Sequence, residues 1–273
     1  MLKRILRHKG AMCILTILTT IILIGIFAPI TAPHDPYAQD IFSKFASPSW
    51  KYPFGTDQLG RCVLSRIIWG IRPTLGLAAI TMIGTMALGL FFGLLSGYFR
   101  GWVDEIIMRS VDVLLSFPSQ IIVFAVVALM GIEIQNVVMA NILIKWAWYA
   151  RMIRTNVIKY RSSNFVNYSK VIGNSNRFIL VKHLLPSIAS ESAMLASLDM
   201  GWAIINISTL SFLSMGVQAP IPEWGAMLND AQAVFISNPL QMVVPGVAIV
   251  LVVSLFNALG DVLRDALDPK EVM

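Results

Sequence analysis

The sequence predicts an all-α transmembrane protein, and three observations carry this prediction. Hydrophobic residues make up 56% of the 273 residues and charged residues only 13%, whereas soluble domains are about 25% charged. Six segments approach the roughly 20 mostly apolar residues that a membrane span needs. The mean hydropathy of +0.72 points the same way. The two cysteines, Cys13 and Cys62, are too few for a disulfide framework. We therefore expect one bundle of membrane helices.

The predicted spans cover residues 11–30, 74–97, 105–130, 136–158, 187–214 and 242–263. The first resembles a signal peptide, but its apolar run is longer than a signal-peptide core, so we expect an uncleaved helix. The fourth is the weakest, because Lys145 interrupts it. Pro118 should kink the third span. Gly89, Gly93 and Gly97 in the second should let another helix approach closely.

The distribution of Lys and Arg predicts the orientation. The N-terminus carries Lys3, Arg4, Arg7 and Lys9, and residues 151–182 are also rich in Lys and Arg, whereas the loop 215–241 has none. By the positive-inside rule, both termini and the segment 151–182 are cytoplasmic. Residues 31–73 should then lie outside although they hold five cations. An interfacial helix near residues 59–72 would account for these cations.

This topology divides the chain into four parts. They are a cytoplasmic tail with the first helix (1–31), an extracytoplasmic segment (32–73), a five-helix core (74–265) and a cytoplasmic C-terminal tail (266–273).

The sequence contains no motif for catalysis, nucleotide binding or metal binding. His8, His34 and His183 lie outside the predicted spans and are not spaced as metal ligands. A phosphate-binding loop and the common hydrolase motifs are absent. We therefore expect a chain that is not an enzyme, has no catalytic or metal-binding residue, and binds no cofactor itself. The net charge of +6 is explained by basic loops without a nucleic-acid partner.

Charged residues inside spans are costly and are usually functional or paired. Asp199 is near the middle of the fifth span, where it could line a translocation path or accept hydrogen bonds from another helix. Asp112 lies three residues after Arg109, which favours a local ion pair, although it too is a candidate for the path. Trp146 and Trp148 could line a path or anchor their helix at the membrane interface.

The loop 216–232 combines prolines and a glycine with polar and aromatic side chains. It could form a gate or meet an extracytoplasmic partner, or it could be an ordered loop that closes the bundle. Its candidate residues are Glu223, Trp224, Asn229 and Asp230.

A polar and basic stretch between the fourth and fifth spans forms a predicted elbow (residues 160–186). Its apolar positions alternate with Asn, Ser, Lys and Arg, which predicts two short amphipathic helices. Gly173 should break the chain between them, and Pro186 suits the first turn of the fifth span. Such helices dock into a partner's groove or lie on the membrane surface.

The same stretch resembles the EAA loop of ABC importer permeases. In "GNSNRFILVKHLLP" the match covers Gly173, Ser175, Ile179, Lys182, His183, Leu185 and Pro186. The stretches 54–66, 106–118, 210–228 and 256–269 are similar to the second permease subunit of dipeptide, oligopeptide and nickel importers. Two positions depart from the family. Asn167-Tyr168-Ser169 replaces Glu-Ala-Ala, and Cys62 stands where the family has aspartate.

The resemblance implies a six-helix type I ABC importer permease fold with a cytoplasmic coupling helix, in the bacterial cytoplasmic membrane. It implies a heterodimer with a homologous permease, embedded in membrane lipid. Two ATPase subunits would bind ATP and Mg²⁺, and an extracytoplasmic binding protein would deliver substrate. The elbow would couple the ATPases to transport, through a set of residues that comprises Asn167, Ser169, Gly173, Ser175, Arg177, Ile179, His183 and Pro186.

Residues 145–154, 196–202, 223–232 and 238–242 are similar to nickel permeases and to importers of metal–chelator complexes. We therefore expect nickel or a metal–chelator complex as substrate, with dipeptides or oligopeptides as the alternative. A proton-coupled carrier would need more ionisable residues than Asp112, Lys145 and Asp199 along its spans. A membrane enzyme would need a nucleophile–base pair or a metal cluster, and the sequence indicates neither.

Overall fold

Helices dominate the structure, a computed structural model that describes residues 9–267. Within this range, β pairing is limited to an isolated bridge between Thr56 and Cys62. The predicted N-terminal cations Lys3, Arg4 and Arg7 lie outside the described residues, as does most of the tail 266–273. The chain divides into two compact units.

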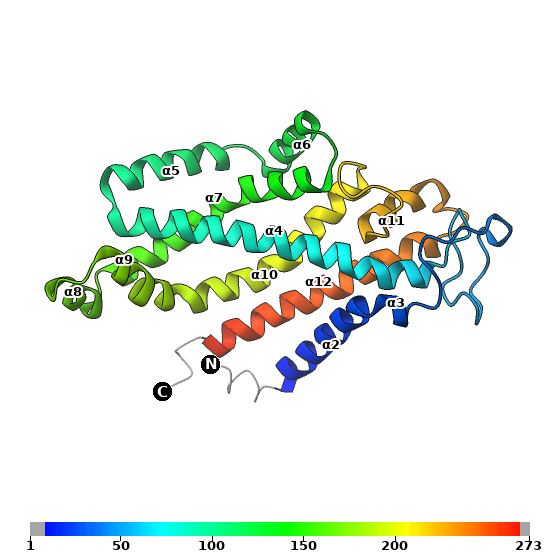
Figure 1. Cartoon of the computed structure of the whole chain (residues 1–273), viewed down its shortest axis with the longest axis horizontal. Helices are drawn as coiled ribbons and strands as arrows, with labels where there is room; N and C mark the ends of the chain where they lie inside the picture. The colour runs from blue at the N-terminus through cyan, green and yellow to red at the C-terminus, as the bar shows by residue number, and fades with distance from the viewer. Residues whose placement is uncertain (1–8, 268–273) are drawn as a thin grey trace. The chain divides into compact units, whose positions relative to one another are not determined.

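Of the described residues, unit 1 contains 9–79, 132–137 and 197–267. Its helices are α2 (Lys9–Ile26), α3 (Ala28–Thr31), η1 (Ile41–Ser43), the start of α4 (Val63–Phe99), the end of α10 (Leu185–Phe212), α11 (Trp224–Ala231), η3 (Gln232–Val234) and α12 (Leu240–Leu267) (Figure 1). Apolar side chains from α4, α10, α11 and α12 build its core, and Ile21 and Ile24 of α2 pack against it.

Unit 2 contains residues 80–131 and 138–196. Its helices are the rest of α4, α5 (Gly101–Leu115), α6 (Ser119–Met130), most of α7 (Ile134–Arg161), α8 (Asn164–Val171), α9 (Asn176–Phe178), η2 (Ile179–Leu184) and the start of α10. A small core forms where Val111 of α5 packs against Ala147 and Ala150 of α7.

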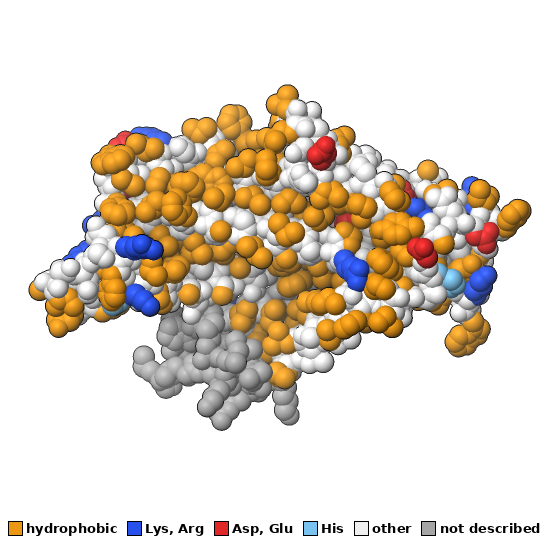
Figure 2. Space-filling model, in the orientation of Figure 1, with side chains coloured by type: hydrophobic (Ala, Val, Ile, Leu, Met, Phe, Trp, Pro, Cys, Tyr) orange, Lys and Arg blue, Asp and Glu red, His pale blue; other side chains and the backbone are white. Residues whose placement is uncertain are grey.

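Three helical runs of the described residues are long and apolar enough to cross a membrane. They are Val63–Phe99, Asn176–Phe212 and Leu240–Arg264. The pair α5 and α6 passes the same test as a broken span, and Gly10–Ile26 is a shorter apolar helix. On the face shown in Figure 2, hydrophobic side chains predominate and charged side chains are few. The first and fourth of the six predicted spans remain predictions, because α2 is short and α7 is too polar for the test.

Near residues 59–72, where the sequence predicts an interfacial helix, the structure has the beginning of a longer helix, and its position at a membrane interface remains a prediction. From Val63 the chain forms one helix, α4, that continues through Pro73 to Phe99. At about 1.5 Å per residue, its 37 residues extend roughly 55 Å, well beyond the ~30 Å hydrocarbon core of a bilayer. The polar beginning of α4 is therefore an extension of the span, and its cations are paired within unit 1 as described below.

Pro118 does more than kink the predicted third span, because it separates two helices that differ in direction by 87°. Proline lacks the N–H that would continue the helix, and it disfavours helical geometry at the residue before it. Ser116 closes α5, with its N–H donating to Asp112 O at 3.0 Å and its hydroxyl donating to Val113 O at 2.7 Å. The segment 105–130 is thus a sharply bent pair.

The glycines of α4 create the close approach to α7 that the sequence predicts. A methyl group added at Gly93 would lie 2.8 Å from the Ala150 carbonyl oxygen, and one at Gly97 would lie 2.7 Å from Val157 Cβ. Cβ atoms essentially never lie this close to another heavy atom, so α4 and α7 pack where a glycine leaves only hydrogen.

Replacing Gly93 by alanine should therefore destabilise unit 2 by roughly 1–3 kcal/mol, the usual cost of overpacking. Gly246→Ala is the matched control, because its added methyl group would meet only Leu228 Cδ2 at 4.0 Å. The measurement is the thermal unfolding midpoint of the purified protein. Equal midpoints for the two variants would show that α4 and α7 are not in close contact.

Candidate functional site

The elbow folds as two short helices around a left-handed glycine. α8 ends at Val171, and Gly173 follows with φ +80°, a conformation that favours glycine. The Ser175 hydroxyl then accepts a hydrogen bond from Phe178 N at 3.3 Å and caps α9. From Ile179 the helix runs on through a π-helical stretch into α10. The predicted break at Gly173 is confirmed, and Pro186 lies in the first turn of α10, but the second helix is not a separate short one, because α9 is continuous with η2 and α10.

Polar contacts brace the elbow inside unit 2. The Asn174 side-chain amide donates to Ser169 Oγ at 2.9 Å. The Tyr98 hydroxyl at the end of α4 donates to Asn176 Oδ1 at 2.7 Å, and Lys170 Nζ lies 5.5 Å from the centre of the Tyr98 ring. Sequence reasoning missed Tyr98, because an aromatic residue beside a predicted span end carries no signal of a partner in a distant loop.

The predicted coupling residues divide into an inner and an outer group. Ser169 and Ile179 are buried inside the elbow. His183 is half-buried, with its ring centroid 5.8 Å from that of Phe165 and 5.5 Å from that of Phe178. The others are exposed, namely Asn167, Gly173, Ser175, Arg177 and Pro186. The inner residues shape the elbow, and only the outer ones are available to a partner.

Three exposed apolar residues form the elbow tip (Tyr168, Val171 and Ile172). They occupy positions i, i+3 and i+4, which lie on one helical face. Their exposed fractions are 67%, 84% and 56%. Exposed cations, Lys170, Arg177 and Lys182, occur along the same segment. The tip is therefore an apolar patch on a braced support with positive charge nearby.

The ion pair predicted between Arg109 and Asp112 is not the one that forms. Arg109 instead lies 3.8 Å from Glu105, one turn earlier on α5, and Asp112 pairs with Arg151 of α7. A second bridge joins the same helices, since Arg154 binds Asp104 through two 2.6 Å hydrogen bonds. Asp112 therefore contributes to the packing of α5 on α7.

The other residues predicted to line the translocation path lie in different environments. Trp146 packs on the core of unit 2 with its ring centroid 4.6 Å from that of Phe92, as a packing residue would. Trp148 is half-buried, with Lys145 Nζ 5.6 Å from its ring. Asp199 is half-buried in the part of α10 that belongs to unit 1. A common path for these residues remains a prediction.

In the outer loop, Glu223 and Trp224 are fixed in the interior of unit 1. Glu223 is 0% exposed, and its carboxylate accepts hydrogen bonds from Ala226 N, Thr74 Oγ1 and Ser208 Oγ at 2.9–3.2 Å. The Trp224 indole N–H donates to Ile67 O at 3.0 Å. Asn229 donates to Phe212 O at 2.6 Å. This geometry favours the ordered loop over the mobile gate.

Asp230 belongs to a charge network that sequence reasoning missed. Its carboxylate lies 3.4 Å from the guanidinium groups of both Arg61 and Arg66. Asp57 completes the network at 2.6 Å from Arg61 and 3.3 Å from Arg66, and both arginines are buried. The two arginines and two aspartates give this network no net charge. One feature of the sequence could have indicated this network. The cations of segment 31–73 do not fit the positive-inside pattern, which suggests that acidic residues neutralise them.

Removing one partner of this network should destabilise the fold strongly. Asp57→Asn leaves two buried arginines with one carboxylate, and breaking a buried ion pair costs about 3–5 kcal/mol. Glu105→Gln is the control, because the Glu105–Arg109 pair is exposed and such pairs are worth less than about 1 kcal/mol. A thermal unfolding midpoint for Asp57→Asn as high as that of the control would refute the network's role.

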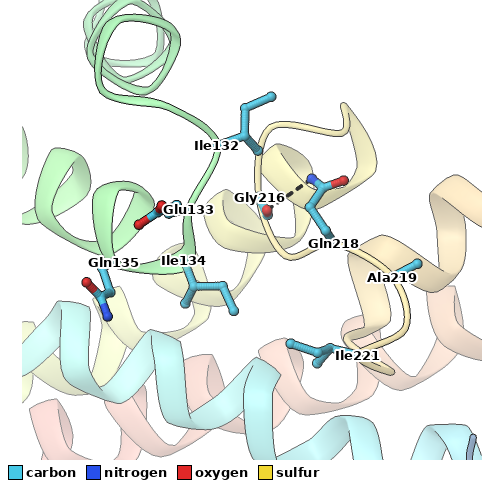
Figure 3. Close-up of a pocket in the computed structure, with 8 residues that line it drawn as sticks. All are labelled: Ile132, Glu133, Ile134, Gln135, Gly216, Gln218, Ala219 and Ile221. Atoms are coloured by element: carbon cyan, nitrogen blue, oxygen red, sulfur yellow. Dashed lines mark hydrogen bonds between the residues drawn. The ribbon is translucent and has the colours of Figure 1, made fainter.

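A pocket of about 300 Å³ lies in unit 1, beside the same outer loop. Residues 132–135 line one side and residues 216–221 the other (Figure 3). The Gln218 amide turns back to donate to Gly216 O at 3.1 Å, and the Glu133 carboxylate stands at the opposite side. The pocket offers one carboxylate, amide groups and isoleucine side chains, a mixed lining that the sequence did not reveal.

Among the described residues, no group of three or more His, Cys, Asp or Glu side chains is placed to hold a metal ion. The paired carboxylates in unit 1 are already engaged by arginines, and Glu223 by hydroxyl and backbone donors. What the geometry does show is an apolar helical protein with one braced elbow. Such an arrangement is that of a membrane subunit that works with other proteins.

Comparison with known proteins identifies this class of membrane subunit. Residues 89–272 match the family described as "Binding-protein-dependent transport system inner membrane component", and residues 1–48 match the "N-terminal TM domain of oligopeptide transport permease C". The chain belongs to the binding-protein-dependent permease family. It is a multi-pass inner-membrane permease subunit of an ABC importer, which works with ATPase and binding-protein partners.

Particular relatives share nearly the whole chain. The metal-staphylopine import permease of Staphylococcus aureus is 43% identical, covering 98% of this chain and 93% of the relative. The nickel permease of Escherichia coli is 39% identical over 93% of this chain and 92% of the relative. The dipeptide permease of Alkalihalophilus pseudofirmus is 37% identical over 98% and 88%.

A solved structure of the inward-facing MetNI methionine ABC transporter contains a similar chain. The TM-score is 0.52 at 16% identity, over 74% of this chain and 97% of the other. The likeness shows the fold, which is the predicted type I importer permease fold.

Proposed function

We propose that this chain is one of two homologous permease subunits that together form a path for nickel or a metal–chelator complex. Its elbow binds one of the two ATPase subunits, which hold ATP and Mg²⁺. The observation that carries the proposal is the elbow tip, three exposed apolar residues on a support braced by Tyr98 and Asn174.

The chemistry of the tip suits a protein groove. Leaving apolar side chains in water is unfavourable, and an exposed helical face with i, i+3 and i+4 apolar anchors gains by insertion into a partner. The exposed Lys170, Arg177 and Lys182 favour an acidic rim around that groove. Because α9 continues through η2 into α10, a displacement of the tip is passed to the start of a membrane helix.

The charges support an orientation with the elbow and both termini in the cytoplasm. Within the segment 31–73, Arg61 and Arg66 are balanced by Asp57 and Asp230. Arg72 donates to two backbone carbonyls. Three of the five cations in this segment are therefore engaged within unit 1, which weakens their opposition to an extracytoplasmic position, and the cations of the elbow set the orientation.

The relatives support a metal-containing substrate. Two of them are named for metal-staphylopine and nickel import, at 43% and 39% identity. The 37% identical dipeptide permease keeps peptide as the alternative. Asp199 is our candidate for a path residue that faces a cationic group of the cargo. An extracytoplasmic binding protein delivers the substrate.

Val171→Asp should separate the permease from its ATPase. Val171 is 84% exposed, so the change should leave the fold intact while placing a charge in the partner's apolar groove. We expect the ATPase subunits to be lost when the tagged permease is purified, together with loss of uptake.

Ile236→Asp is the matched control, since Ile236 is 97% exposed and belongs to unit 1, whereas the elbow belongs to unit 2. It should retain the ATPase subunits. Retention of the ATPase subunits by Val171→Asp as well would contradict the proposed role of the tip.

Substrate class is tested by uptake in cells with and without this gene. We expect labelled nickel, free or with a chelator, to enter only when the gene is present, and labelled dipeptide to enter equally in both. Gene-dependent dipeptide uptake without metal uptake would establish the alternative. Asp199→Asn should reduce metal uptake by more than it reduces the amount of assembled complex.

A further inference from the structure

An apolar pocket of about 370 Å³ opens in unit 1 among α2, α4, α10 and α12. Its size falls within the range of about 300–1,000 Å³ that small-molecule sites occupy. Its apolar lining includes Ile22, Leu75, Ala79, Met200 and Phe256. Neither the elbow nor the outer loop contributes to it.

Gly76 leaves part of this space open. A Cβ added at Gly76 would have no atom within 4 Å, although most of the other α4 glycines lie against neighbouring side chains or backbone. On the α2 side, Gly25 packs against Ile71 and brings the two helices together beside the opening. The missing side chain of Gly76 thus creates a hollow that a flexible apolar chain can fill.

Among the described residues that line the pocket, Arg72 is the only charged one. Its Nε donates to Gly25 O at 2.7 Å and its Nη2 donates to Ile26 O at 2.5 Å. These are carbonyls at the end of α2, where a helix leaves its last acceptors unsatisfied. The guanidinium also lies 4.9 Å from the Trp69 ring. It is exposed and has five N–H groups, so it retains donors for an anion.

The end of α2 also marks a polar boundary. An arginine capping helix carbonyls beside a tryptophan is typical of the interface between hydrocarbon and headgroups. The pocket therefore begins at this interface and extends along Leu75, Gly76 and Ala79 toward the hydrocarbon interior. An occupant must be anionic at one end and apolar along its length.

We propose that this pocket binds an anionic phospholipid, with its phosphate on Arg72 and an acyl chain in the hollow at Gly76. Arginine recognises phosphate through charge-assisted hydrogen bonds. The acyl chain fits because the surrounding solvent is itself lipid, and filling the hollow restores packing contacts that a void would lose. With the orientation proposed above, the site lies in the extracytoplasmic leaflet.

Photo-crosslinking on the assembled importer in lipid nanodiscs tests this site. The probe is phosphatidylglycerol with a photoactivatable group on its acyl chain, compared with the same probe built on phosphatidylcholine. We expect labelling within residues 22–26 and 71–79, several-fold stronger with phosphatidylglycerol. Gly76→Phe should reduce this labelling several-fold. Val250→Phe, an exposed α12 position outside the pocket, should not change it.

Arg72 is tested through the ratio of labelling by the two probes, which does not depend on protein yield. Arg72→Gln keeps an N–H donor for the α2 carbonyls but should abolish the preference for phosphatidylglycerol. Arg72→Lys should retain the preference. Three outcomes would overturn the proposal. They are unchanged labelling in Gly76→Phe, equal labelling by the two probes in the unmodified importer, and crosslinking of this segment to the partner permease in place of lipid.

Discussion

The cost of burying a polar or charged group without a partner is the constraint on which the described structure depends. A group shielded from water must find its partner inside the protein. Glu223 satisfies this condition with three donors, and Arg61 and Arg66 satisfy it with Asp57 and Asp230. Arg72 serves the carbonyls at the end of α2. The bond between Thr74 and Glu223 and the contacts of Asp230 with Arg61 and Arg66 join segments more than a hundred residues apart, so the requirement for pairing also organises unit 1.

The elbow carries exposed apolar side chains outside the predicted membrane spans. Val166, Ile179 and Leu184 form its interior, while Tyr168, Val171 and Ile172 remain uncovered. An exposed apolar patch with charged residues around it is typical of a site that meets a partner. The family of the chain supplies that partner as an ATPase. The brace through Tyr98 explains how a contact at the tip can act on membrane helices without a flexible joint.

The sequence predicted the features that depend on nearby residues, and it did not predict the contacts between segments that are far apart in the chain. The elbow helices, the left-handed Gly173 and the glycine packing of α4 follow from neighbouring residues, and the structure contains them. The pairing of Asp112 with Arg151 depends on a partner far away in sequence. The same holds for the bond between Tyr98 and Asn176. The resemblance to a permease family could be recognised because its motifs are contiguous, whereas cargo contacts are dispersed and remain proposals.

The central claim is that the elbow tip faces the ATPase and not the membrane surface. A photo-crosslinking amino acid in place of Val171, in the assembled importer within its native membrane, measures this directly. The account predicts a covalent product between this chain and an ATPase subunit. A product with phospholipid, or with neither lipid nor ATPase, would contradict it.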